Sequence, residues 1–454
     1  NYGEQDGGVI SANAPLKIRN LFLVGNIRTR AHVIEDELQE AYKASTVEEV
    51  HTSLQNAVKR LNGLGLFSSV EVTIDEAKGN IGKEYLTDVK IKVKEKDILS
   101  LKAGTYSSVG KEPDVSVETA GLLRNPSGHG EIITGSSSWA RSGSNTMQLS
   151  LTKPRVKGEK IGLQAMLRSD LVNMEEHSSF QEVVKGASAG LNTHDGRHGL
   201  TYNLAFRDLR PRRWDATPFA YNASLSVISE AKPSLKSSLE YCYKEDRRDN
   251  PLCPTSGTLY EAKSEVAGLM GDVEFLKLVM RYQWHQRLTP EIFGQPGISA
   301  SVCLNMGAIR PFGSKETGTL LNDRFFLGGP LYLRGFQYCG VGPRAPESEG
   351  GSVGGDSLGG DLYTTASATL TAPFPHPFLA ATGLRAQAFV NVGNLETWRT
   401  PISHFRQNCR TSAGVGLVIP TAFGRIEIDY SWILHQKPYD KTKPFQIGVG
   451  ISFD

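Results

Sequence analysis

The chain has 454 residues, long enough for two domains, and its formal net charge of +2 gives no strong field that would indicate a nucleic-acid partner. No stretch approaches the roughly 18 consecutive apolar residues of a membrane-spanning helix, which excludes a helical membrane protein. A hydrophobic content of 39% still allows a membrane β-barrel, because barrel strands alternate lipid-facing with lumen-facing side chains and average out to the hydropathy of a soluble protein.

The N-terminal part predicts a flexible segment over residues 1–14 and a small α+β domain over residues 15–97. A first strand is expected from Lys17 to Val24, followed by two helices. Their apolar residues recur at helical spacing: Ile34, Leu38 and Ala41, then Val47, Val50, Leu54, Ala57, Val58 and Leu61. Two strands with alternating apolar residues follow: Val70, Val72 and Ile74, then Val89, Ile91 and Val93.

Capping residues support the two helices. Thr29 is expected to cap the first, and Thr46 with Glu49 forms a capping box for the second. The order strand, helix, helix, strand, strand fits many small α+β domains. The turn from Leu64 to Val70 resembles that of a POTRA domain, whose open sheet edge can hold an extended peptide by strand addition.

Residues 98–454 predict an all-β membrane barrel of about 16 antiparallel strands. In the final strand, residues 445–453, one face carries Phe445, Ile447, Val449, Ile451 and Phe453. In residues 424–432 the inward face carries Arg425, Glu427, Asp429 and Ser431. Most such segments are near the ~9–11 residues that a tilted strand needs to cross a bilayer, and an even number lets an antiparallel sheet close.

A soluble sandwich or propeller is the alternative, because its strands alternate as well. A sandwich core favours large interlocking side chains, whereas the apolar faces here often carry Ala and Val. Lipid requires no interlocking, so the composition of these faces favours the barrel.

One connection is far longer than a usual barrel turn: residues 310–358 show no clear strand alternation. Its centre, residues 323–336, holds too many aromatic and aliphatic side chains for a solvated loop. We therefore expect this loop to fold back into the lumen and pack there. Arg334 would then be partly dry and would need a carboxylate or several carbonyl groups.

The sequence around Arg334 resembles a known family. Leu333-Arg334-Gly335-Phe336 matches the (V/I/L)-R-G-(F/Y) loop of the POTRA-plus-barrel insertases and translocases of bacterial, mitochondrial and chloroplast outer membranes. The wider string from Arg324 to Pro343, followed by residues 358–361, is most similar to the mitochondrial branch, the central barrel of the sorting and assembly machinery (SAM) complex. The resemblance runs from about residue 15 to the end, with several motifs in the same order.

Two positions depart from the bacterial pattern. Asn391, in Phe389-x-Asn391-x-Gly393, stands where bacterial members have Asp, and Thr369 aligns with an acidic residue. The usual counter-charges of the loop arginine are therefore absent. The remaining inward-facing candidates to pair with Arg334 are Asp361, Glu427 and Asp429. Arg334 could serve as a plain anchor of the loop or as part of a switch.

Motifs of enzyme chemistry are missing. The five cysteines (Cys242, Cys253, Cys303, Cys339 and Cys409) are odd in number and have no CxxC spacing, which argues against a disulfide scaffold. No G-x-S-x-G, Walker or H-E-x-x-H motif occurs, and the pair His194 and His198 lies in an expected hairpin turn. We therefore predict no catalytic residue, cofactor or metal.

A barrel has one seam, between its first strand (here residues 98–109) and its last. Gly448 and Gly450 add little side-chain packing there, so the seam can open as a lateral gate and exchange strands with a client. The last strand fits the polar-x-Gly-x-x-hydrophobic-x-hydrophobic signal of mitochondrial barrel precursors. The expected gate residues are Leu101, Ala103, Thr105, Gln446, Gly448, Gly450, Ile451 and Phe453.

The resemblance implies insertion and assembly of unfolded β-barrel precursors in the mitochondrial outer membrane. It also implies a POTRA domain that faces the intermembrane space, metaxin-like peripheral SAM subunits, and small intermembrane-space chaperones that deliver clients. The surrounding partner is the lipid bilayer. The alternative is a translocation pore of a chloroplast or bacterial outer membrane, whose members typically carry two or more POTRA domains. A passive porin is a third class, disfavoured by the long apolar loop.

Overall fold

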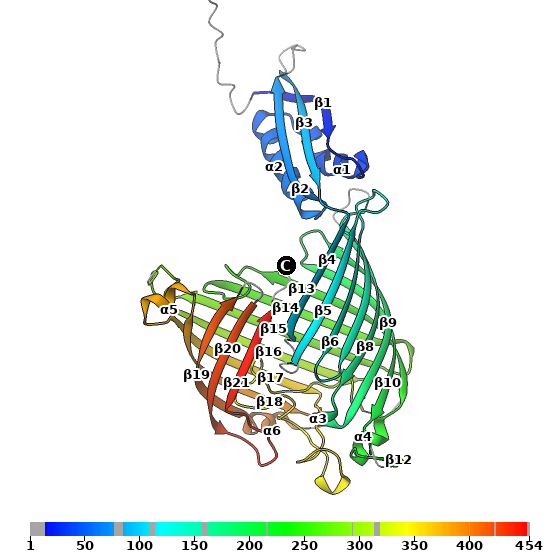
Figure 1. Cartoon of the computed structure of the whole chain (residues 1–454), viewed down its shortest axis with the longest axis vertical. Coiled ribbons are helices and arrows are strands. Elements are labelled where there is room, and N and C mark those ends of the chain that lie inside the picture. The colour runs from blue at the N-terminus through cyan, green and yellow to red at the C-terminus, as the bar shows by residue number, and fades with distance from the viewer. Residues whose placement is uncertain are drawn as a thin grey trace, which may run out of the picture. The chain divides into compact units, whose positions relative to one another are not determined.

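The computed structural model describes residues 14–76, 85–108, 114–156, 161–214, 217–292, 294–312, 318–398, 400–421 and 424–451 (Figure 1). The chain divides into two compact units. The first comprises Asn1–Lys102, Ala120–Gly135 and Leu149–Ala165. The second comprises Ala103–Thr119, Ser136–Gln148 and Met166–Asp454.

The N-terminal elements follow the predicted order and fit a POTRA domain. They are β1 (Leu16–Val24), α1 (Ala31–Lys43), α2 (Val47–Gly63), β2 (Phe67–Glu76) and β3 (Tyr85–Glu95). The sheet order is β1-β3-β2, with β1 parallel and β2 antiparallel to β3. The predicted apolar faces meet in one core, which includes Ile34, Leu38, Val50, Leu54, Leu61, Val89, Ile91 and Val93.

Local sequence signals explain the turn after β1 and the N-cap of α2, but they do not explain the start of α1. Gly25 has φ +94°, and a Cβ there would lie 2.0 Å from the Val93 carbonyl oxygen. Thr46 accepts a hydrogen bond from the Glu49 N–H at 3.3 Å, which is half of the predicted capping box. The other half is wrong by one residue, because the Glu49 carboxylate accepts from the Ser45 N–H at 2.9 Å. The prediction that Thr29 caps α1 is wrong: α1 begins after Arg30, and the Thr29 hydroxyl accepts a hydrogen bond from the Asn125 amide instead.

Sixteen strands form one sheet in the order β21-β20-β19-β18-β17-β16-β15-β14-β13-β10-β9-β8-β7-β6-β5-β4, which confirms the predicted barrel fold. They are β4 (Leu99–Ser108), β5 (Asp114–Arg124), β6 (Ile132–Ala140), β7 (Asn145–Lys153), β8 (Ile161–Asn173), β9 (Phe180–Thr193), β10 (His198–Pro211), β13 (Pro233–Asp246), β14 (Gly257–Gly271), β15 (Phe275–Arg287), β16 (Ser299–Pro311), β17 (Leu362–Pro373), β18 (Arg385–Glu396), β19 (Arg410–Thr421), β20 (Gly424–His435) and β21 (Phe445–Ile451). Short elements lie in the connections: α3 (Glu175–Ser178), β11 (Arg213–Trp214), β12 (Thr217–Tyr221), α4 (Leu225–Glu230), a 3-10 turn (Glu347–Glu349), α5 (Pro377–Ala381) and α6 (Ile402–Gln407).

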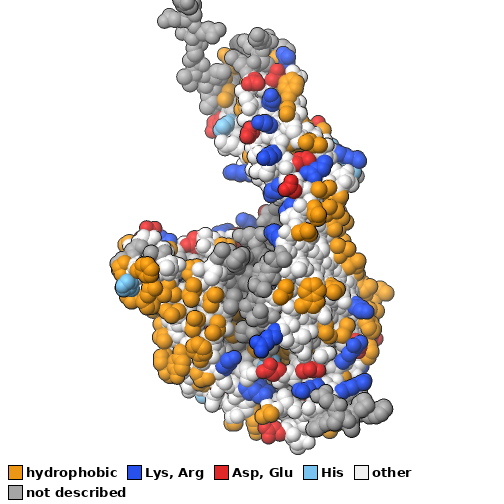
Figure 2. Space-filling model, in the orientation of Figure 1, with side chains coloured by type: hydrophobic (Ala, Val, Ile, Leu, Met, Phe, Trp, Pro, Cys, Tyr) orange, Lys and Arg blue, Asp and Glu red, His pale blue; other side chains and the backbone are white. Residues whose placement is uncertain are grey.

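Side chains alternate across the sheet as the sequence predicts. In β21, Phe445 and Ile447 are 54% and 48% exposed, whereas Gln446 between them is 4% exposed. Figure 2 shows hydrophobic side chains spread over the barrel strands, and charged side chains gathered toward the lower end of these strands and over the N-terminal domain. In the described part of the chain, no helix is both long and apolar enough to cross a membrane.

The long connection between β16 and β17 spans residues 312–361. Most of its described hydrophobic residues are buried, and the largest group of them packs in a cluster with Tyr363 and Leu395 of the strands. The buried loop residues of this cluster are Leu327, Leu333, Phe336 and Val341.

Candidate functional site

Antiparallel connectivity defines two rims of the barrel. The near rim holds turns 247–256, 288–298 and 374–384, and the far rim holds turns 272–274, 397–409 and 436–444. The loop over residues 312–361, called the lumen loop below, starts and ends at the far rim.

Arg334 of the lumen loop lies against two carboxylates of β20. Its Nε donates to Asp429 Oδ2 at 2.9 Å, and one terminal nitrogen donates to Glu427 Oε2 at 2.6 Å. The two carboxylates are two residues apart on a strand and so share its inward face. The guanidinium also stacks on Phe389 of β18, 4.7 Å from the ring centroid. Burial of these charges is tolerable because each one is paired.

The remaining oxygens of this cluster are also engaged. Glu427 forms a second ion pair with Arg425, at 2.6 Å, and Asp429 accepts a hydrogen bond from the Gln387 amide at 2.7 Å. Two of the three candidate partners of Arg334 are therefore brought to it.

Asp361, the third candidate, lies elsewhere. Its carboxylate accepts hydrogen bonds from the Thr319 hydroxyl and from the Trp398 N–H. Asp361 directly precedes β17 at the far rim, where it joins the loop to the turn after β18. The expectation that it pairs with Arg334 is wrong, because no strand period governs the position of a loop residue.

The motif residues next to Arg334 attach the loop to β21. The Gly335 N–H donates to Gln446 Oε1 and Gln446 Nε2 donates to the Phe336 carbonyl, both at 2.8 Å. Gly335 has φ +89°, and a Cβ there would lie 2.6 Å from Ile433 Cδ1. At Gly448, a Cβ would lie 3.0 Å from Pro330 Cβ. The last strand is thus held by the loop at two positions.

The predicted residues of β18 contribute packing more than polar contacts. A Cβ at Gly393 would lie 3.0 Å from Leu333 Cδ1, so the glycine makes room for the fully buried Leu333. Asn391 donates to the Ser412 hydroxyl at 3.5 Å, and its Oδ1 has no partner among the described residues. Ser412 in turn donates to the Arg334 carbonyl at 2.6 Å.

All the predicted gate residues except Phe453 lie on β4 and β21, the two end strands of the sheet order. Within the described residues no ladder joins these strands. Leu101 is 76% exposed. The structure describes only the backbone at Ala103, Thr105, Gly450 and Ile451, and Phe453 lies outside the described residues.

A second ionic anchor of the lumen loop escaped the sequence reasoning. Asp323 is buried and accepts two hydrogen bonds from Arg207 of β10, at 2.7 and 3.0 Å. Lys236 of β13 lies 3.4 Å from it, and Lys277 of β15 donates to its carbonyl at 2.8 Å. Burial raises the pKa of the Asp323 carboxyl, but the charges of Arg207, Lys236 and Lys277 and the hydrogen bonds from Arg207 together outweigh burial, and the pKa falls below its ordinary value. The sequence signal that could have indicated this anchor is the position of Asp323 directly before the basic and aromatic residues 324–326.

A third anchor holds the far-rim end of the lumen loop. The Asp356 carboxylate accepts hydrogen bonds from the Ser179 hydroxyl at 2.6 Å, the Ser224 N–H at 2.8 Å and the Ser352 N–H at 2.8 Å. Burial raises the pKa of Asp356, and these hydrogen bonds bring the pKa below its ordinary value. The lumen loop is therefore attached to β10, β13 and β15, to β18–β21 and to the far-rim connections.

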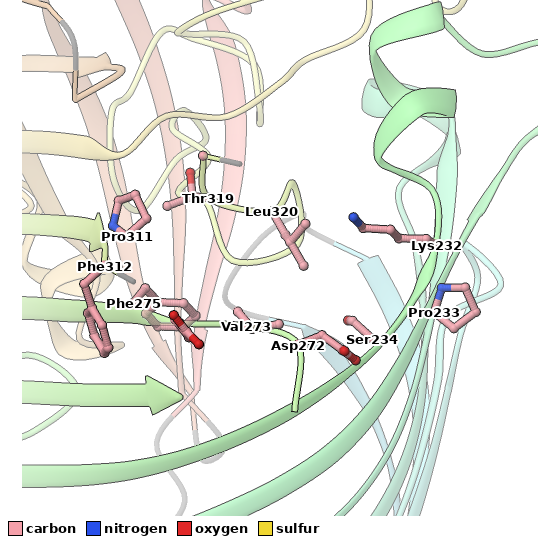
Figure 3. A pocket seen from close by; sticks show the side chains of 12 residues that line it. Lys232, Pro233, Ser234, Asp272, Val273, Phe275, Pro311, Phe312, Thr319 and Leu320 are labelled. Atoms are coloured by element: carbon pink, nitrogen blue, oxygen red, sulfur yellow. The ribbon is translucent and has the colours of Figure 1, made fainter. Parts of the chain in front are cut away.

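Two cavities border the lumen loop. One of about 250 Å³ lies at the far rim, where Figure 3 shows Pro311 and Phe312 on one side and Lys232 on the other, with Leu320 of the loop between them. The other, of about 340 Å³, lies between the loop tip (Leu331 and Tyr332) and the near-rim turn 251–254. Among the described residues, no three His, Cys, Asp or Glu side chains cluster as metal ligands would.

Comparison with known proteins matches residues 125–453 to the Omp85 superfamily domain. A SAM50-like protein of Schizosaccharomyces pombe is 30% identical over 98% of this chain and 92% of its own length. The sorting and assembly machinery component 50 homolog A of Xenopus laevis and the sorting and assembly machinery component 50 homolog of Homo sapiens are each similar at 29% identity, with the same coverage.

Solved structures show the same fold. BamA from Haemophilus ducreyi lacking POTRA domains 1–3 superposes with a TM-score of 0.76 at 20% identity, over 96% of this chain and 85% of its own. CdiB from Acinetobacter baumannii superposes with a TM-score of 0.55 at 13% identity, over 97% and 74%.

Proposed function

The chain belongs to the Omp85 superfamily, among the SAM50-like proteins, and from that premise we propose that it inserts and assembles β-barrel precursor proteins in the mitochondrial outer membrane. The observation that carries the proposal is the hold of the lumen loop on β21 through Gln446 and Gly448. A diffusion pore has no use for such a clamp on its last strand. An insertase that exchanges strands at its seam needs β21 held in place while β4 is free to pair with a client.

The energy for insertion comes from exchange of hydrogen bonds. While β4 and β21 are unpaired, their edge backbone N–H and C=O groups face hydrocarbon, where each unpaired group costs several kcal/mol. A client strand that pairs with β4 removes this cost. Burial of the client's apolar face in lipid adds a further favourable term. The proposed activity therefore requires no nucleotide and no catalytic residue.

The last strand also has the sequence pattern that we expect in the signal strand of a client. Gln446, Gly448 and Ile451 have the spacing of the precursor signal, and the structure places Gln446 inward and Ile447 outward. A client strand with the same pattern can reproduce the contacts of Gln446 with the lumen loop. We place the POTRA domain in the intermembrane space, where small chaperones deliver clients, and assign metaxin-like peripheral subunits as partners.

Site-specific crosslinking tests the gate. The variant Ala103→Cys or Thr105→Cys is made in a chain whose five native cysteines are replaced. It is expected to form a disulfide with a single cysteine placed in the signal strand of a stalled precursor. Leu191→Cys on β9, which is 45% exposed, is the matched control and should not react. Crosslinks at Leu191→Cys with none on β4 would contradict strand exchange at this seam.

Reconstitution separates insertion from translocation. The pure chain in liposomes should accelerate membrane integration of an unfolded barrel precursor, measured as protection from added protease and heat-modifiable migration on gels. Release of the precursor as a soluble chain inside the vesicles would instead support a translocation pore.

A further inference from the structure

The near-rim cavity carries more positive charge than its own carboxylates neutralise. Its volume is about 340 Å³, within the range of ligand-binding sites. Six cationic side chains line it, against the single carboxylate of Glu261. They are Lys244, Arg248, Arg281, Arg334, Arg385 and Arg425.

Half of these cations have a carboxylate partner. Arg334 pairs with both Glu427 and Asp429, and Arg425 pairs with Glu427. Arg248 binds Asp246 at 2.6 Å. Glu261 does not add to this balance, because Lys263 pairs with it at 3.1 Å.

The other half have none. Within the described residues no carboxylate lies within ion-pair distance of Lys244, Arg281 or Arg385. Arg385 donates to the carbonyls of Pro296 and Gly297 and thereby holds turn 288–298. Arg281 donates only its Nε, to Asn305 at 3.3 Å, which leaves both terminal nitrogens without a partner among the described residues. Five donors in a fixed fork suit a carboxylate.

The spacing of the arginines distinguishes an extended ligand from a compact one. Arg281, Arg385 and Arg425 lie on β15, β18 and β20, so neighbours along the wall are three and two strands apart. The register also separates Arg281 from Arg385 along the strands: Arg281 is level with Gly393 of β18, through Asn305 and Thr365, and Arg385 lies eight residues (393 minus 385) further along β18. At ~3.4 Å per residue this offset is about 27 Å. One phosphate group cannot reach across this offset. An extended peptide rises ~3.3 Å per residue, so a segment of about nine residues that carries several carboxylates can reach from Arg281 to Arg385.

We propose that the near-rim cavity binds an acidic, extended segment of a polypeptide, with Arg281 as the principal contact. The inference rests on the proposed function, because an incoming client is the polypeptide that reaches this space. The segment would lie against Leu331 and Tyr332 at the tip of the lumen loop and beside Arg334. Its carboxylates would then compete with Glu427 and Asp429 for Arg334. Binding of the segment in the cavity would therefore weaken the contact of the lumen loop with β20.

Binding of a labelled peptide to the full chain in lipid nanodiscs tests this. A short fluorescein-labelled peptide with Glu at alternate positions is expected to bind saturably, and a peptide with Gln in place of each Glu is not. Binding should disappear near 1 M salt, where the Debye length is about 3 Å. Arg281→Gln should weaken it about tenfold or more, as expected for loss of a charged hydrogen bond, and Arg281→Lys less.

Arg197→Gln is the matched control. Arg197 lies in the near-rim turn 194–197, is half exposed, pairs with Asp195 and does not line the cavity. It should bind the Glu peptide as the unmodified chain does. Equal binding of both peptides, or unchanged binding by Arg281→Gln, would overturn the proposal. Competition by inorganic phosphate or pyrophosphate as effective as that by unlabelled Glu peptide would show a compact oxyanion site instead and also overturn it.

The two proposals fail in different ways. A chain that integrates precursors into liposomes but does not bind the Glu peptide refutes the cavity assignment and leaves insertion standing. A chain that binds the peptide but integrates no precursor refutes insertion. Heat-modifiable migration of each variant on gels shows that its barrel is folded before either assay is interpreted.

Discussion

At the scale of single residues, the candidate site is a set of buried charges whose cost is offset by mutual pairing. Arg334 is 8% exposed and Glu427 and Asp429 are at most 1% exposed. An arginine is suited to this place because its planar guanidinium can bind two carboxylates and stack on the Phe389 ring together. The alternation of side chains in the sequence predicted that Glu427 and Asp429 both face the lumen as candidate partners of Arg334, since residues two apart on a strand share a face.

Removal of the arginine alone should be costly. Arg334→Gln leaves Glu427 and Asp429 buried with one fewer cation, and loss of one partner of a buried pair costs about 3–5 kcal/mol. The double variant Arg334→Gln, Asp429→Asn should recover part of this loss, because Arg425 still neutralises Glu427. Urea unfolding in lipid vesicles, followed by tryptophan fluorescence, measures both. A double variant less stable than the single would show that repulsion between the carboxylates is not the cause.

At the scale of elements, strands were predictable from the sequence and the lumen loop was not. Period-two alternation gave the inward faces of β18, β20 and β21 because each strand has only two faces. No such period orders the loop, so Asp361 was assigned to the wrong partner. The Asp323–Arg207 pair, 116 residues apart in the chain, was not foreseen at all. The need for burial of the loop was readable from its composition, but its contacts depend on long-range packing.

A glycine substitution tests how closely the lumen loop is packed. Gly335→Ala would place a Cβ 2.6 Å from Ile433 Cδ1 at a φ of +89°, so backbone strain of about 1–3 kcal/mol adds to a clash. Gly196→Ala is the matched control, with φ +68° and no atom within 4 Å of the new Cβ. Gly335→Ala should lower the urea midpoint more than Gly196→Ala does. Equal shifts of the urea midpoint in the two variants would mean that the lumen loop accommodates a Cβ at residue 335 without a loss of stability.

At the scale of the whole molecule, the lumen loop connects parts of the barrel that are distant in the sheet order. Asp323 attaches it to β10, β13 and β15, and twelve and thirteen residues later (335 and 336 minus 323) Gly335 and Phe336 attach it to β21. A rigid connection of this kind can transmit a change at the last strand to the opposite part of the sheet. A loose one would leave the two attachments independent.

A double-mutant cycle distinguishes these cases. Asp323→Asn weakens the first attachment and Gln446→Ala the second, and the two residues share no partner. Independent sites add to within about 0.3–0.5 kcal/mol. If the loop acts as one body, release at one end lowers the contribution of the other, so the double variant should lose about 1 kcal/mol less than the sum. Asp323→Asn combined with Asn20→Ala, which removes the contact of Asn20 with Asp88 in the first unit, should be additive. Additivity in both pairs would contradict transmission through the loop, and the hold on β21 would then be a local anchor.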